Sequence, residues 1–210
     1  MMVSPMQKMS LRARRLWNDR SGLAAVEFAM IFPMMVVMFF GVLELSAAIA
    51  VDRKATLVAR TLSDLTSQMA SVADADLVSF GEAAKAIMTP YPGPPLISSV
   101  TEVYVDSVTG VARVQWSKGL TIGTTGVVSI AATAPHNPGD VVVLPTTLVA
   151  AKDTYVIWSE VAYTYTPAIG YMVAKTGMTF RDAAYTRPRT VACVTYPTPI
   201  SGPLPACPKL

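Results

Sequence analysis

Histidine, cysteine and charge are all scarce in this sequence of 210 residues, of which only 15% are charged. The single histidine, His136, lies in the turn-forming segment Ala-Pro-His-Asn-Pro-Gly-Asp, and we interpret it as a turn residue. The sequence contains no Gly-x-Ser-x-Gly motif and no phosphate-binding glycine loop followed by Lys and Ser or Thr. We therefore expect no enzymatic activity, no cofactor, no metal and no small-molecule substrate.

Charge is scarcest in residues 22–51, where Glu27 and Glu44 are the only ionisable side chains. A helix needs about 20 mostly apolar residues to cross a bilayer. A helix in the core of a soluble protein rarely stays apolar on every face for so long. We predict that residues 23–51 form a transmembrane helix.

Basic residues gather in front of this stretch. Residues 1–22 contain one acidic residue, Asp19, and five basic ones: Lys8, Arg12, Arg14, Arg15 and Arg20. Basic residues that flank a span stay in the cytoplasm, so residues 1–22 are predicted to be a cytoplasmic leader, with the chain after the span outside. The rest has 12 basic and 13 acidic residues, and we expect no binding to nucleic acid.

The start of the apolar run reads Gly22-Leu23-Ala-Ala-Val-Glu27-Phe28. This pattern resembles the processing site of type IV pilins of the tight-adherence (Flp/Tad) class, in which a membrane aspartyl prepilin peptidase cuts after the glycine. Residues 24–33 and 40–45 resemble the TadE/TadG-like pilus assembly proteins. The resemblance implies a minor pseudopilin in the bacterial inner membrane, cleaved between Gly22 and Leu23. Its partners would be the prepilin peptidase, the Flp pilin and other pseudopilins.

Glu27 and its neighbour Phe28 belong to this motif. Cleavage would create an α-amine one helical turn from Glu27, and the resemblance implies that this carboxylate pairs with the amine of a neighbouring subunit. An unpaired charge in a medium of low dielectric constant is strongly unfavourable. The alternative is an uncleaved signal anchor with Glu27 at the membrane interface, holding the outer domain as an adhesin or assembly scaffold.

Two further residues of the span are candidates for a role. Pro33 removes a backbone donor and clashes with the carbonyl of Ala29, so we expect a kink there, with or without a role in extraction from the bilayer. Glu44 falls near the outer end of the span, where it contacts either a partner helix or lipid headgroups.

Residues 52–95 are predicted to be helical and then to form a linker. An apolar stripe at spacings of four, three and four extends the first helix to about Ser71: Val58, Leu62, Leu65 and Met69. A second helix is predicted over residues 74–88, with Asp74 or Asp76 as its cap. The proline-rich residues 89–95 then form a stiff linker.

Residues 96–210 are predicted to be a β-rich extracytoplasmic domain. Residues 155–166 alternate most clearly, with Ile157, Val161, Tyr163 and Tyr165 on one face. A hairpin is expected around residues 106–110, with Val114 and Trp116 alternating with Arg113 and Gln115. Short strands are placed near Val127 and Val141, and a last strand over residues 178–185. The segments 158–167 and 185–189 also resemble the TadE/TadG-like family. The expected fold class is α+β and pilin-like: a long N-terminal helix, a short helix and an antiparallel sheet.

Both cysteines, Cys193 and Cys207, lie near the C-terminus and, on this topology, outside the cytoplasm. Oxidising compartments favour a disulfide, which would close a proline-rich loop of 13 residues. Two free thiols or a metal pair are the weaker alternatives, because there is no Cys-x-x-Cys spacing.

Overall fold

The computed structural model describes residues 22–167, 177–197, 207 and 209. Apart from Gly22, the basic leader lies outside the described residues, as does most of the loop between the two cysteines. The chain divides into two units, Met1–Leu45 and Ser46–Leu210, and each is described by itself.

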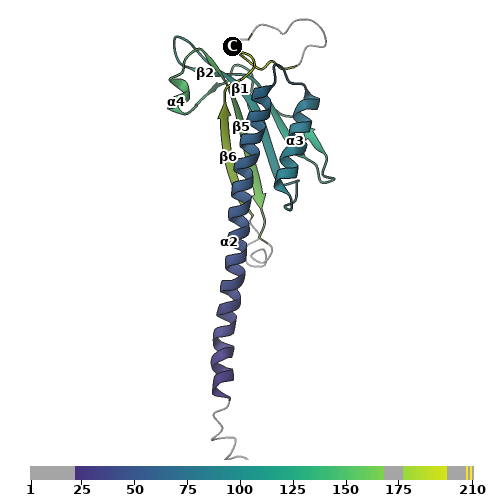
Figure 1. Ribbon diagram of the computed structural model, residues 1–210, viewed down its shortest axis with the longest axis vertical. Coiled ribbons are helices and arrows are strands. Elements are labelled where there is room, and N and C mark those ends of the chain that lie inside the picture. Colours follow the sequence, from purple (N-terminus) through teal and green to yellow (C-terminus); the bar gives the residue numbers. More distant parts are fainter. Residues whose placement is uncertain (1–21, 168–176, 198–206, 208, 210) are drawn as a thin grey trace, which may run out of the picture. The chain divides into compact units, whose positions relative to one another are not determined.

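The longest element is the 46-residue helix α2, Leu23–Gln68 (Figure 1). Its first part, residues 23–45, makes up the described part of the first unit together with Gly22. At about 1.5 Å per residue this part is about 35 Å long, enough for the hydrocarbon core of a bilayer, which is about 30 Å thick. The remaining part of α2 belongs to the second unit, where Ala48 and Val51 are buried in the core. The prediction of one helix extending far beyond the apolar run is confirmed.

The second helix, α3, runs over Asp74–Met88, as predicted. The side chain of Asp76 accepts a hydrogen bond from the backbone N–H of Ala73 at 2.9 Å and so caps the first turn. Asp74 instead accepts a bond from the hydroxyl of Tyr196 at 2.7 Å. At the other end, Lys54 Nζ donates to the carbonyls of Ile87 and Thr89 at 2.6 and 2.7 Å, which satisfies the open end of the helix.

The remaining elements form one antiparallel sheet of six strands in the order β3-β2-β1-β5-β6, with β4 paired to β2. The strands are β1 Leu96–Val105, β2 Ala112–Ile122, β3 Val128–Ile130, β4 Val141–Val142, β5 Thr154–Tyr165 and β6 Met178–Thr186, and a short helix, α4, spans Thr146–Val149. The predicted α+β fold class is confirmed.

One face of the sheet packs against α3 and the second part of α2. Val58 and Leu62 of α2 and Ile157 of β5 are fully buried in one core. The helix is also bonded to the sheet directly, because Ser63 Oγ donates to the carbonyl of Ile157 at 3.2 Å. The face of β5 on which the sequence groups Ile157, Val161 and Tyr163 is therefore the one that meets α2.

The simple alternation expected for β2 is wrong at one point. Glu102 of β1 lies opposite Trp116, whereas the next residue, Val103, lies opposite Val114. The extra residue in β2 is a β-bulge at Gln115, so Val114 and Trp116 point to opposite faces of the sheet. Trp116 consequently turns into the core beside Glu102.

Candidate functional site

The predicted cleavage site lies at the N-terminal end of α2. Gly22 is in a turn, and Leu23 is the first residue of the helix. Across this junction, the N–H of Val26 donates a hydrogen bond to the carbonyl of Gly22 at 3.1 Å. The first N–H groups of any helix lack helical acceptors. Opening the chain at Gly22–Leu23 therefore costs little helical structure.

The side chains of residues 23–45 form an apolar surface on all sides of α2. Apart from half-buried Val36, the large apolar side chains of this segment are between 37% and 76% exposed. Within the described residues, α2 is the one helix that is long and apolar enough to cross a membrane. A continuous apolar surface of this size is far larger than a soluble monomer leaves in water. Lipid or neighbouring helices must cover it.

Glu27 lies on this apolar surface. Its side chain is exposed, and it makes no hydrogen bond or ion pair with the described residues. The adjacent Phe28 packs its ring 5.5 Å from that of Phe32, one turn further along. A carboxylate costs roughly 2.5 to 3.5 kcal/mol at mid-span on insertion scales. No described residue offsets this cost for Glu27.

Pro33 and Glu44 occupy the same helix. α2 continues on both sides of Pro33, and the kink and its role stay predictions. Glu44 is half-buried, and its contact with a partner helix or with headgroups also stays a prediction.

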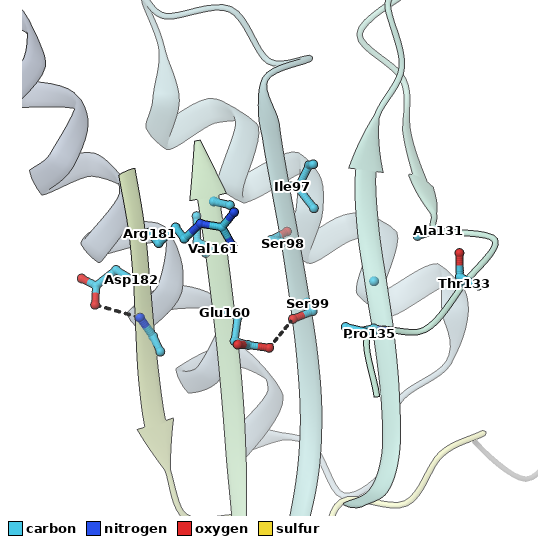
Figure 2. A pocket seen from close by; sticks show the side chains of 13 residues that line it. Ile97, Ser98, Ser99, Ala131, Thr133, Pro135, Glu160, Val161, Arg181 and Asp182 are labelled. Atoms are coloured by element: carbon cyan, nitrogen blue, oxygen red, sulfur yellow. Dashed lines mark hydrogen bonds between the residues drawn. The ribbon is translucent and has the colours of Figure 1, made fainter. Parts of the chain in front are cut away.

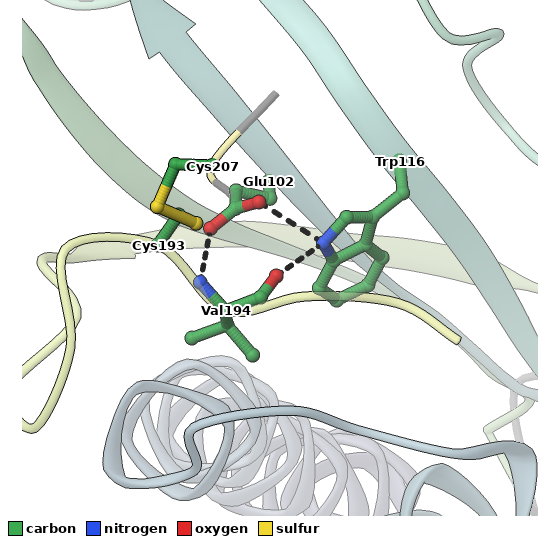
Figure 3. The surroundings of a disulfide bond; sticks show 5 residues. All are labelled: Glu102, Trp116, Cys193, Val194 and Cys207. Atoms are coloured by element: carbon green, nitrogen blue, oxygen red, sulfur yellow. Dashed lines mark hydrogen bonds between the residues drawn. A yellow bond between two sulfur atoms is a disulfide. The ribbon is translucent and has the colours of Figure 1, made fainter. Parts of the chain in front are cut away.

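A second cluster lies in the outer domain around the disulfide, which joins Cys193 and Cys207 as predicted (Figure 3). The residue after Cys193, Val194, is bonded through both of its backbone groups. Its N–H donates to Glu102 Oε1 at 2.6 Å, and its carbonyl accepts from the indole N–H of Trp116 at 2.7 Å. The same indole N–H also reaches Glu102 Oε2 at 3.1 Å.

Glu102 is fully buried. Burial raises the pKa of its carboxyl group to about 7, against the opposing effect of the bonds from Val194 and Trp116. Sequence reasoning missed this cluster and gave Glu102 no role. The one available signal was that Glu102 is the only charged residue in β1.

The segment that contains Val194 ties the end of α2 to the sheet. The backbone of Thr195 bonds to the two residues that flank Ser71. Its carbonyl accepts from the N–H of Val72 at 3.0 Å, and its N–H donates to the carbonyl of Ala70 at 3.3 Å. The N–H of Arg189 donates to the carbonyl of Ser67 at 2.9 Å. A disulfide closing a loop of this length stabilises a fold by roughly 3 kcal/mol. We assign this cluster to the stability of the domain.

The outer face of the sheet carries a hollow of about 530 Å³ (Figure 2). Its lining includes small side chains such as Ser99, Ala162 and Ala183. His136, expected to be a plain turn residue, stacks on Trp158 with ring centroids 4.8 Å apart. Its Nε2 lies 3.1 Å from Glu160 Oε2.

This arrangement does not build a hydrolytic site. Ser99 Oγ donates to Glu160 Oε2 at 3.5 Å, the same oxygen that His136 contacts. An imidazole activates a serine only when it contacts the hydroxyl itself, and here the carboxylate lies between them. The described residues contain no group of three or more His, Cys, Asp or Glu that could hold a metal ion.

The structure thus defines an α+β domain that carries an N-terminal helix able to anchor it in a membrane. Residues 22–63 match the family model of the TadE-like proteins, which confirms the resemblance found at the N-terminal end, whereas the resemblance of residues 158–167 and 185–189 stays a prediction. No curated protein and no solved structure matches the chain. The TadE-like segment contains Gly22, Glu27 and Glu44 and connects the chain to Tad pilus function.

Proposed function

We propose that this chain is a minor pseudopilin of a Tad (Flp) pilus system, processed by a prepilin peptidase after Gly22. It is held in the inner membrane by α2, with its N-terminus in the cytoplasm and its β domain in the periplasm, and it serves assembly rather than catalysis. The observation that carries the proposal is the TadE-like match, which begins at Gly22. It coincides with the start of α2 and with a Glu27 that has no partner among the described residues.

The chemistry of the helix end supports processing there. Cleavage leaves an ammonium group on Leu23, at the positive end of the helix dipole, where a cation is disfavoured and a carboxylate is favoured. Glu27 lies about one helical turn further on. An ammonium and a carboxylate at the membrane edge both keep their charge at lower cost when they meet. A pair formed between subunits would also set their axial register.

The test is N-terminal sequencing of the protein extracted from membranes, with and without an active prepilin peptidase. We expect the mature protein to begin at Leu23 and the Gly22→Ala variant to keep its leader. Gly41→Ala is the matched control. A Cβ atom added at Gly22 or at Gly41 meets nothing within 4 Å, so neither substitution disturbs the packing of the chain.

An intact N-terminus in cells with an active peptidase would contradict the proposal. It would favour the alternative, an uncleaved anchor that holds the β domain outside as an adhesin or assembly scaffold. Normal processing of Gly22→Ala would show that the peptidase does not read this glycine.

A further inference from the structure

Strand β6 forms an open edge of the sheet. In the strand order β3-β2-β1-β5-β6 it has β5 on one side and no described strand on the other (Figure 1). Alternate residues of an antiparallel strand point their backbone groups toward the same neighbour. The N–H of Ala183 is bonded to the side chain of Asp182 at 2.7 Å rather than to β5 (Figure 2). The odd-numbered residues 179–185 therefore turn their N–H and C=O groups outward.

A groove runs beside this edge. It has a volume of about 570 Å³ and is lined by Arg60, Thr61, Asp64 and Leu65 of α2 and by residues 183–186 of β6. Leu65 is half-buried, so the groove offers apolar surface from Leu65 and Ala184. A strand added to β6 would place every second side chain on the helix side, over this groove.

The charges around the edge are unbalanced. Arg60 beside the groove and Arg187 just after β6 are exposed, and so is Arg181 of β6, whose side chain extends over the hollow on the outer face of the sheet (Figure 2). None of the three pairs with a carboxylate among the described residues. The neighbouring carboxylates are already engaged. Asp64 pairs with Arg189, and Asp182 holds the N–H of Ala183. The surface is complementary to negative charge.

We propose that β6 binds an extended, acidic segment of a partner protein as an additional strand of the sheet. The outward backbone groups of β6 would provide the hydrogen bonds, while the three arginines select for acidic side chains and the groove takes the apolar ones. The carboxylate of Asp182 accepts the hydrogen bond from the Ala183 N–H until a carbonyl of the incoming strand replaces it as the acceptor. This bond also protects the free edge against unselective pairing. The proposal concerns the β domain alone and holds whether or not Gly22 is processed.

The test uses the full chain in detergent micelles and a fluorescein-labelled peptide, Glu-Val-Glu-Val-Glu-Val-Glu, with binding followed by fluorescence polarisation. We expect the double variant Arg60→Glu, Arg181→Glu to weaken binding about tenfold or more. Ala183→Pro should have a similar effect. Proline removes an N–H that points away from β5, so it blocks strand addition without removing a bond within the sheet. Arg113→Glu, an exposed charge reversal on β2, which β1 and β5 separate from β6, should leave binding unchanged.

A second peptide separates strand addition from plain charge attraction. The same sequence with N-methylated backbone amides keeps its charges but loses its donors, and we expect it to bind at least about tenfold more weakly. On binding the unmodified peptide, the amides of Arg181, Ala183 and Tyr185 should become protected from hydrogen exchange, a readout that does not depend on any variant folding.

Three results would overturn the proposal. The first is no binding of the acidic peptide up to about 1 mM, the weak end of specific affinity. The second is equal binding of the N-methylated peptide. The third is a dimer of the chain, seen by sedimentation and abolished by Ala183→Pro, which would show that the occupant of β6 is a second copy.

Discussion

The two parts of α2 are covered in different ways. In residues 23–45 the large apolar side chains are mostly exposed, whereas Val51, Val58 and Leu62 in the second part are fully buried by the sheet and α3. The same secondary structure thus carries an apolar face for its own domain and an apolar surface for its surroundings. The contrast shows which part of the helix serves the fold and which part is available for membrane and subunit contacts.

The two carboxylates in apolar surroundings show the same contrast. Glu102 is buried in the domain and accepts bonds from two donors of its own chain, Val194 and Trp116. Glu27 has no partner among the described residues. A buried carboxylate with internal donors belongs to the architecture of the domain. A carboxylate without such donors among the described residues is suited to recognition.

The largest effect is expected from shortening a leucine on the buried part of α2. Leu62→Ala removes a fully buried side chain, and such a change typically destabilises a domain by about 2–5 kcal/mol. Leu43→Ala, in the exposed part of the same helix, should change the stability of the β domain by less than about 0.5 kcal/mol. Urea unfolding in detergent, followed by near-ultraviolet circular dichroism, measures both. Equal losses would show that the two parts of α2 are not covered differently.

The next effect concerns pH and Glu102. Its pKa is raised from 4.5 to about 7 in the folded protein, so between these values the folded state keeps a proton that the unfolded state has released. The free energy of unfolding should therefore fall as pH rises through this window, by about 3 kcal/mol in total. Above a pH of about 7 the contribution of Glu102 to the free energy of unfolding should no longer change with pH, since its carboxyl group is then ionised in both the folded and the unfolded state.

Glu102→Gln isolates this contribution, because glutamine cannot ionise. The free energy of unfolding of the wild type minus that of the variant should fall as pH rises from 4.5 to about 7 and stay constant outside this window. A difference that stays constant through this window would show that Glu102 does not change its charge there.

Much of the fold could be predicted from the sequence, because individual helices and strands are recognisable from the periodic spacing of their apolar residues. The alternation of Ile157, Val161 and Tyr163 identified β5 and its buried face, and the bounds of α3 were predicted to the residue. At the candidate site, the motif from Gly22 to Phe28 located the start of α2, since the signal there is local. The TadE-like match covers the same residues.

The missed features all depend on pairings between distant segments. Whether Trp116 faces the core depends on a bulge that is visible only in the register with β1. The burial of Glu102 depends on donors that include Val194, 92 residues further along the chain. The stacking of His136 depends on Trp158. None of these contacts produces a periodic pattern in the sequence. His136 was interpreted as a turn residue because its neighbours are turn-forming residues.

The smallest effect on the chain itself is expected at Glu27. Because its side chain is exposed and makes no hydrogen bond or ion pair with a described residue, Glu27→Gln should change the stability of the β domain by less than about 0.5 kcal/mol. Membrane insertion should persist and even become easier, since a buried charge opposes insertion. Cleavage after Gly22 should continue, yet crosslinks to other pilus subunits and the number of pili should fall, because the amine of a neighbouring subunit loses its partner. Asp52→Asn, an exposed carboxylate of the same helix beyond the predicted span, is the matched control for deleting one charge. Normal crosslinking and piliation of Glu27→Gln would show that Glu27 only rests at the membrane interface, and a loss of cleavage would place its role in recognition by the peptidase.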